Sequence, residues 1–386
     1  MRSILWLAVL LAGALPASAR TIVVSEGGSI RDALAGASAG DRIEVMPGTY
    51  QEGDEGDLNA LTITRRGISL VGKPTKERAV ILQSRARQSY GVWVSPANSA
   101  GPGNQDNTED PPCGRPGRDS ATLQGFSIRG FTVRGFAEHG VHLACVDGFS
   151  ILDNHADQNT VYGLFPVRSK NGVMAGNLVT NTETDAAIYV GQSDNVLITG
   201  NVVHGNLLGI EVENSRHCAV IGNHAYANTM GIFVDILPFL QKKTQQDTLV
   251  AFNSVHDNNR PNTAERGELL SFLRPGIGLL IAGGERTTVL MNDVRDNGFA
   301  GIAVSSLCLG LELQGGDCLG LDIDPNPVND RILANRLVGN GKIPMPDFPL
   351  DALKADLIWD GSGTGNCWSG NSFAPPSTPP ELPACQ

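Results

Sequence analysis

Apolar and polar positions alternate along most of this chain, in a phrase that restarts about every 22 to 24 residues. The phrase is clearest between residues 177 and 228, where apolar residues alternate inside it and Asn or Gly marks its corners. A period of two is typical of β-strands, and a repeat of this length is typical of one coil of a solenoid. We therefore expect stacked coils of short strands rather than a conventional globular domain.

Two landmarks align the coils. A small residue followed by alternating apolar residues recurs at Gly91, Gly140, Gly163, Ala187, Gly209, Gly231, Gly278 and Gly301. An Asn ends the preceding strand at Asn154, Asn177, Asn201, Asn223, Asn253, Asn292 and Asn335, and a second Asn follows five residues later in six of these seven coils. Amide side chains at one corner of successive coils can hydrogen-bond along the stack, so we interpret these residues as structural ladders and not as catalytic groups.

The two ends of the chain predict caps for this stack. A strand at residues 21–24 precedes an amphipathic segment, residues 28–37, for which Ser29 is a candidate N-cap. A short helix there would cover the open hydrophobic end of the first coil. The proline-rich residues 373–386 cannot form another coil and are expected to close the other end as a tail.

Insertions lengthen several coils at one corner. Three of them follow the same strand of their coils and should project together, at residues 95–120, 237–247 and 306–329. A fourth, residues 259–275, leaves from the opposite end of that strand.

The N-terminal segment indicates where the protein is located, and the net charge limits the kinds of partner it can have. Residues 1–19 begin with Arg2, continue through a short apolar run and end in Ala17-Ser18-Ala19, which is typical of a cleaved signal peptide. Without Arg2 the formal net charge moves from −11 to −12. We therefore expect an exported protein, periplasmic or secreted, with no membrane span, and the acidic balance argues against nucleic acid as a partner.

The cysteines suit an oxidising compartment. Cys308 with Cys318, and Cys367 with Cys385, are close enough in sequence to be disulfide pairs. Three cysteines remain, so at least one thiol should be free; their pairing stays open for Cys113, Cys145 and Cys218.

Chemistry is expected on the outward face of the strand that follows the small residue. The second residue after it points outward, which gives an unusual aromatic stripe of Trp93, His142, Phe165, Tyr189 and Phe233. One interpretation is a sugar-binding cleft in which rings stack on pyranose faces. The alternative is an aromatic stack covered by the long insertions.

Three carboxylates on the same face form a candidate catalytic group. Glu213 and Asp235 occupy equivalent places on adjacent coils, roughly 4.8 Å apart, and Glu211 lies two residues before Glu213, roughly 6.6 Å along the strand. Such carboxylates can bind a divalent cation such as calcium, or act as the acid and base pair of a glycosidase. The alternative is that they are solvated and paired with nearby cations, namely Arg216, Lys242 and Lys243.

A second polar cluster, His256-Asp257-Asn258-Asn259, borders an insertion. One interpretation is that this cluster ligates a metal ion. The simpler interpretation, which we favour, is another Asn corner with a His in its turn.

The Asn-rich coils, the opening strand-helix-strand with PGTY, and the block that begins NTMGIFVDILPFL resemble the right-handed parallel β-helix repeat proteins. More narrowly, they resemble a bacterial exported group related to the accessory protein of nitrous oxide reductase and to carbohydrate-binding or sugar-hydrolase β-helix domains. The resemblance implies an all-β fold: a single-stranded, right-handed parallel β-helix over residues 20–372 with an N-terminal capping helix. For activity it is unspecific, because such folds host lyases, epimerases, hydrolases and proteins without a known reaction.

An epimerase is disfavoured by one local departure. Lyases and epimerases need a base to remove a proton, for which His142 and Tyr189 are candidates. The alginate epimerases carry Asp-Pro-His-Asp, whereas the nearest segment here is Asp324-Pro325-Asn326-Pro327, in an inserted loop.

The sequence thus favours recognition of a polysaccharide along the aromatic and acidic face, with cleavage by a hydrolase or lyase as the enzymatic version of that hypothesis. Two other classes stay open. One is a non-catalytic periplasmic accessory protein for metalloenzyme maturation, which the lack of Cys- or Met-rich clusters disfavours. The other is a structural or surface-interaction scaffold.

Overall fold

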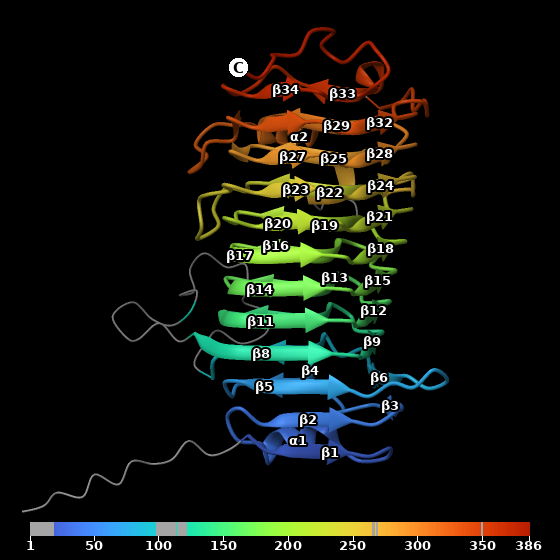
Figure 1. The fold of residues 1–386 in the computed structure, drawn as a ribbon, viewed down its shortest axis with the longest axis vertical. Helices are drawn as coiled ribbons and strands as arrows, with labels where there is room; N and C mark the ends of the chain where they lie inside the picture. Colours follow the sequence, from blue (N-terminus) through green and yellow to red (C-terminus); the bar gives the residue numbers. More distant parts are fainter. Residues whose placement is uncertain (1–18, 98–112, 114–121, 265–266, 268, 349) are drawn as a thin grey trace, which may run out of the picture.

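Parallel strands stack in three long sheets along one axis (Figure 1). The computed structural model describes residues 19–97, 113, 122–264, 267, 269–348 and 350–386. Residues 1–18 of the expected signal peptide and most of the expected insertion at 95–120 lie outside the described residues.

Over the described residues, sheet A has 12 strands, and sheets B and C have 10 each. The strands of sheet A, in stacking order, are β1 (Thr21–Val24), β2 (Arg42–Val45), β5 (Ile68–Gly72), β8 (Leu123–Arg129), β11 (Val146–Leu152), β14 (Lys170–Ala175), β17 (Asp194–Thr199), β20 (Ala219–Ile221), β23 (Leu249–Ala251), β27 (Thr288–Leu290), β31 (Arg331–Leu333) and β34 (Cys367–Ser369). Those of sheet B are β3 (Gly48–Tyr50), β6 (Val80–Gln83), β9 (Thr132–Arg134), β12 (His155–Asp157), β15 (Leu178–Thr180), β18 (Val202–His204), β21 (His224–Tyr226), β24 (Ser254–His256), β28 (Asp293–Arg295) and β32 (Arg336–Val338). Those of sheet C are β4 (Asn59–Ile63), β7 (Tyr90–Val94), β10 (His139–Ala144), β13 (Tyr162–Val167), β16 (Ala186–Gly191), β19 (Leu208–Glu213), β22 (Met230–Asp235), β25 (Ile277–Ala282), β29 (Ala300–Ser305) and β33 (Ala355–Trp359).

Each coil runs through sheet A, sheet B and sheet C before the next coil begins above it. Connections between parallel strands are right-handed, so the predicted right-handed parallel β-helix is confirmed. Inward side chains such as Val203, Ile210 and Val220 are fully buried in one continuous core along the axis. The small residue of each coil has a steric reason: a Cβ at Gly209 would lie 2.4 Å from the carbonyl oxygen of Gly231 in the next coil.

The predicted asparagine ladders are present. In the first, Asn201 Nδ2 donates to Asn223 Oδ1 at 2.9 Å, and the same link repeats from Asn154 to Asn371. In the second, Asn206 Nδ2 donates to Asn228 Oδ1 at 2.9 Å. Except for the half-buried Asn371, these amides are buried, and they satisfy the backbone of the turns, so their role is structural.

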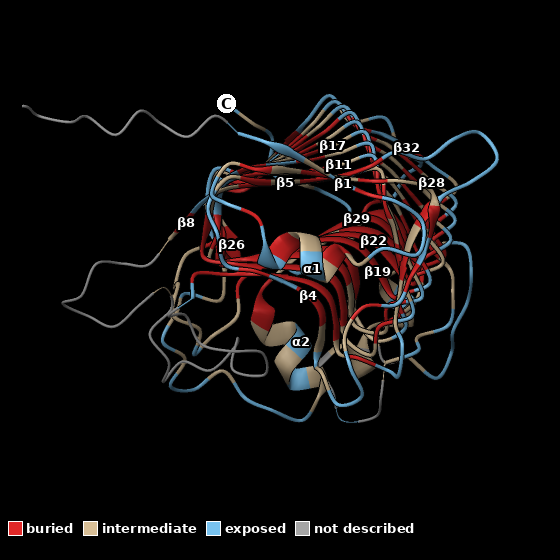
Figure 2. Cartoon of the chain, turned by 90° about the horizontal axis from the view of Figure 1, so that it is seen from below, coloured by how far each residue is buried: buried red, intermediate tan, exposed pale blue. Residues whose placement is uncertain are grey.

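Both ends are closed as expected. Helix α1 (Ile30–Ala35) begins at Ser29, whose side chain accepts from Asp32 N, and its Ile30 and Leu34 join the core beside the first coils (Figure 2). At the other end the tail forms isolated parallel bridges on the last coil, including Ile358 with Thr378. The tail therefore continues the stacking direction in single bridges and not as regular strands.

Disulfide bonds lie in both the C-terminal tail and the insertions. Cys308–Cys318 and Cys367–Cys385 are bonded as predicted, and Cys113 pairs with Cys145. Among the described residues Cys218 is the free cysteine, and it is buried.

Insertions gather over the outer side of sheet C. Helix α2 (Leu307–Leu313) lies there, outside the coils (Figure 2). The short helical turns η1 (Leu269–Phe272) and η2 (Asp351–Leu353) precede β25 and β33 of the same sheet, and a two-stranded sheet of β26 (Gly284–Glu285) and β30 (Pro327–Val328) adjoins. No described helix has the length and apolar character needed to cross a membrane.

Candidate functional site

The outer face of sheet C carries the side chains that the sequence predicts as substrate-binding and catalytic. Strand pairing places them in the expected columns: one holds Trp93, His142, Phe165, Tyr189, Glu211 and Phe233, and the next holds Glu213 and Asp235. The predicted alignment of the coils is therefore confirmed at the level of single residues.

The aromatic residues of this face stack on one another. Trp93 and His142 lie in parallel with ring centroids 4.3 Å apart, and Phe165 and Tyr189 follow at 4.6 Å. All of them, and Phe233, are between 0% and 8% exposed. The ring faces on which a sugar would stack are therefore already covered by neighbouring rings.

A second hydrophobic cluster lies outside the coil, on this face, and contains Phe165, Tyr189 and Phe233. Leu270 and Leu273 from the insertion before β25 pack against it. The expectation of an open, sugar-stacking platform does not match this burial; the alternative, an aromatic stack beneath the insertions, describes the geometry. Rings repeated along the stack would expose a long apolar stripe to water, and covering them stabilises the fold.

The two buried histidines are poor candidates for a base. His139 Nδ1 and His142 Nδ1 are 3.0 Å apart and share a hydrogen bond. Burial lowers the pKa of His139 to about 3 and lowers that of His142 well below its usual value. Both rings are therefore neutral and weakly basic at neutral pH.

The three predicted carboxyl groups meet. Glu211, Glu213 and Asp235 each offer an oxygen, and these oxygens lie within 4.8 Å of one another. All three are at most 5% exposed. Tyr189 donates a hydrogen bond of 2.6 Å to Glu213 Oε1, while Asp235 Oδ1 has no hydrogen-bond partner among the described residues.

Burial controls the charge of this cluster. It is the first cause of a pKa raised well above the usual value for both Glu211 and Asp235. The neighbouring carboxyls add to it, Asp185 for Glu211 and Glu213 for Asp235. Protonated carboxyl groups are therefore held beside other carboxyls at a pH where an exposed one is ionised.

The alternative partners proposed from the sequence are engaged elsewhere. Arg216 Nε and Lys242 Nζ lie 2.8 and 2.7 Å from Asp194 Oδ1, on the edge of sheet A. Lys243 pairs with Asp322 in the long insertion. The interpretation of the cluster as solvated carboxylates paired with these three cations is wrong.

Two members of the network were missed in the sequence. Asp185 directly precedes β16 and interacts with Glu211, and Tyr162 donates to Asp185 Oδ2 at 3.0 Å. Alignment on the small residue considers only positions after it. Both residues lie before it, where the column of outward positions also runs through sheet C.

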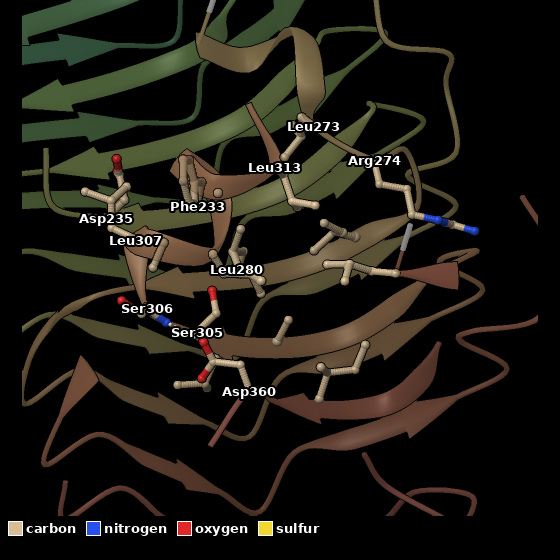
Figure 3. A pocket seen from close by; sticks show the side chains of 18 of the residues that line it. Phe233, Asp235, Leu273, Arg274, Leu280, Ser305, Ser306, Leu307, Leu313 and Asp360 are labelled. Atoms are coloured by element: carbon tan, nitrogen blue, oxygen red, sulfur yellow. Dashed lines mark hydrogen bonds between the residues drawn. The ribbon is translucent and has the colours of Figure 1, made fainter. Parts of the chain in front are cut away.

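An apolar pocket of about 170 Å³ adjoins the cluster (Figure 3). Glu211 and Asp235 line one part of it, and the insertions supply most of the remaining walls through Leu273, Leu307 and Leu313. This pocket depends on chain segments far apart in sequence, so no local pattern predicts it.

Arg274 lies across this pocket from Asp235 (Figure 3). Its side chain is 3% exposed, bonds Asp351 Oδ1 at 2.7 Å and lies over the ring of Phe299, 4.4 Å from the centroid. The pocket therefore has carboxyl groups on one side, an ion-paired guanidinium on the other, and apolar walls between them.

The middle of the chain matches a known family. A family model described as periplasmic copper-binding protein (NosD) matches residues 116–297. The match includes all four carboxyls of the network and confirms the family resemblance that the sequence predicts. No curated protein matches the sequence significantly.

Solved structures share the fold over nearly the whole chain. The A-module of the mannuronan C-5 epimerase AlgE4 from Azotobacter vinelandii is 14% identical, with a TM-score of 0.57 over 89% of this chain and 94% of that one. The periplasmic alginate epimerase AlgG is 18% identical, with a TM-score of 0.52 over 92% and 77%. DFA-IIIase from Arthrobacter chlorophenolicus A6 is 16% identical, with a TM-score of 0.52 over 92% of each chain. At these identities the likeness shows the shared parallel β-helix alone.

Proposed function

We propose that this protein is an exported, polysaccharide-active β-helix protein that cleaves a glycosidic bond at the buried carboxyl cluster. One observation carries the proposal: Glu211, Glu213 and Asp235 lie together with oxygens within 4.8 Å, and burial raises the pKa of two of them. Glycoside hydrolysis needs one protonated and one ionised carboxyl at the same bond.

The roles follow from the surroundings of each carboxyl. Glu211 and Asp235, whose raised pKa keeps a proton available, suit the acid that protonates the leaving oxygen. Glu213, oriented by Tyr189, suits the nucleophile that attacks the anomeric carbon; water then releases the sugar. The short separation favours the retaining geometry, because inverting enzymes hold their carboxyls roughly 6.5 to 9.5 Å apart to admit a water.

The comparisons support a sugar partner. Two of the solved structures named above are epimerases of mannuronan or alginate, which are polysaccharides. Epimerisation itself is not favoured, because Asp324 and Asn326 lie in the long insertion and line a separate pocket with Gln245 and Glu285. That pocket contains none of the carboxyls of the cluster.

The test is release of reducing ends from a panel of neutral and acidic polysaccharides by the purified mature protein. We expect Glu211→Gln and Glu213→Gln each to lower turnover roughly 100-fold or more. Asp153→Asn is the matched control, because Asp153 is an exposed carboxylate on sheet A's border that pairs with Arg129. Equal turnover in all four proteins would overturn the proposal, and so would the absence of both binding and turnover across the panel.

A second candidate is a non-catalytic accessory role in metalloenzyme maturation, which the family match favours. Copper fits imidazole nitrogen better than carboxylate oxygen, so the acidic cluster does not suit it. Burial raises the pKa of the Cys218 thiol to about 11, which disfavours a thiolate ligand there. His224 and His256 on sheet B, whose Nε2 atoms lie 2.6 Å apart, do suit it. Metal binding without turnover would favour this second role.

A further inference from the structure

Two histidines from adjacent coils face each other on the outer side of sheet B. His224 begins β21 and His256 ends β24, and their Nε2 atoms are 2.6 Å apart. Ala225 and Val255 between the outward positions are fully buried in the core, so both imidazoles point away from the coil. Residues 32 apart in sequence thus bring two imidazole nitrogens to one point.

An aspartate sets the orientation of one ring. His256 Nδ1 lies 2.7 Å from Asp257 Oδ2, in the turn that follows β24. A proton held on Nδ1 by this carboxylate leaves the lone pair of Nε2 directed at His224. In metal sites, a histidine ligand is commonly oriented in this way: a carboxylate accepts the hydrogen bond from Nδ1, and Nε2 binds the metal.

The strands that carry the pair are fixed at both ends by the ladders. Asn223 Nδ2 donates to Asn253 Oδ1 at 3.0 Å before the two strands, and Asn228 Nδ2 donates to Asn258 Oδ1 at 3.0 Å after them. The two imidazoles are therefore mounted on a rigid frame, which reduces the entropy lost when they bind a common ion.

We propose that His224 and His256 bind a late first-row divalent metal ion through their Nε2 atoms, with Asp257 as the positioning residue. Imidazole suits copper, nickel and zinc, and copper(II) should bind most tightly of these. Nitrogens about 2.0 Å from one ion in neighbouring positions would be roughly 2.8 to 3.3 Å apart. The observed separation of 2.6 Å is slightly shorter, so the two rings must turn apart until both Nε2 lone pairs point at the ion.

The charged surroundings set the strength of such a site. Arg295 on β28 lies directly across from His256, and its charge opposes a cation. Asp293 offsets part of that charge, with its Oδ2 3.4 Å from Arg295 Nε. Two protein ligands leave the remaining positions to water or to a donor from another molecule, so the ion should be exchangeable rather than structural.

Tag-free, metal-stripped protein titrated with copper(II), nickel(II) and zinc(II) tests the proposal. Calorimetry should give one site per chain that is strongest for copper, and the copper signal in electron paramagnetic resonance should show coupling to two imidazole nitrogens. H224Q and H256Q should each weaken copper binding roughly tenfold or more and remove one nitrogen coupling, and Asp257→Asn should weaken it roughly tenfold while retaining both.

His155→Gln is the matched control, because His155 is another outward histidine of sheet B, hydrogen-bonded to Thr180 Oγ1 at 3.1 Å. It should leave copper binding unchanged. Glu211→Gln should also leave it unchanged, which separates this site from the carboxyl cluster. No stoichiometric copper binding, or binding that survives H224Q and H256Q, would overturn the proposal whatever the outcome of the glycan assays.

Discussion

At the scale of single residues, Glu211 and Asp235 show how burial keeps an ordinary carboxyl group protonated. Neither residue is unusual in sequence, yet burial and neighbouring carboxyls raise the pKa of each well above its usual value. Selective burial of this kind is found at functional sites, where a fold tolerates a cost in stability for the sake of chemistry.

This burial predicts a pH dependence of stability. The pKa of Asp235 is raised in the folded state, so its contribution is fully present below the unfolded value near 3.8 and is lost as pH rises through the folded pKa. Asp235→Asn should therefore be more stable than wild type at neutral pH and nearly equal to it near pH 3. Each unit of pKa elevation corresponds to about 1.4 kcal/mol.

Denaturant unfolding of both proteins at several pH values measures this difference. Asp330, whose pKa burial raises to about 8, titrates in the same sense in both proteins and cancels in the comparison. A stability difference that is constant with pH would contradict the assignment of Asp235 as a protonated group.

At the scale of elements, short strands are held in register by side chains at their ends. The strands of sheet B between the ladders have only three residues in most coils, too few to be stable by pairing alone. Asn206 shows the compensation: its Nδ2 donates to Val179 O and Asn228 Oδ1, and its Oδ1 accepts from Thr182 N.

Asn206→Ala should lower the free energy of unfolding by roughly 3 kcal/mol, because it leaves buried backbone groups unsatisfied at about 1 to 3 kcal/mol each. Asn206→Thr is the control and should cost less, since Thr182 occupies the equivalent place one coil earlier and its hydroxyl bonds Asn206 Oδ1 at 3.0 Å. Denaturant unfolding of the three proteins compares them. Wild-type stability in Asn206→Ala would show that the amide bonds of the ladder contribute little.

At the scale of the whole molecule, the stack is closed at its ends and covered along one side. The tail lies on the final coil, where Phe373 and Leu382 pack against the core, and Cys367–Cys385 ties it down. The insertions cover sheet C and form the pocket beside the carboxyl cluster. The cap therefore stabilises the end of the stack, whereas the cover both buries the apolar face of sheet C and forms the pocket.

Replacing Cys367 and Cys385 by Ser should destabilise the last coils by about 3 kcal/mol, because the bond closes a loop of 18 residues. Amide hydrogen exchange should rise in β31 and β34 and stay unchanged in β11 to β20, since each coil contacts only its neighbours. The same replacement at Cys308 and Cys318, in the α2 insertion, is the control and should leave exchange in β34 unchanged. Uniform loosening along the stack would contradict this division.

The features that the sequence predicted correctly are those that depend on short-range patterns along the chain. The coil repeat, the ladders, the cap at Ser29 and the neighbourhood of Glu213 and Asp235 all follow from a period of two and a constant coil length. Asp185 and Tyr162 were not predicted, because they lie before the small residue on which the coils were aligned. The histidine pair escaped because only His256 stood in a conspicuous motif, whereas its partner His224 lies one coil earlier.

The parallel β-helix follows from local sequence alone, because every coil repeats the same short-range pattern of inward Val and Ile, small residues and corner Asn. Which outward residues are exposed to water depends instead on long-range packing. Insertions of irregular sequence fold back over sheet C, and this long-range packing buries the carboxyl cluster and the rings of Phe165, Tyr189 and Phe233. Burial then sets the charge of Glu211 and Asp235, so the chemistry of the site depends on contacts that no repeat encodes.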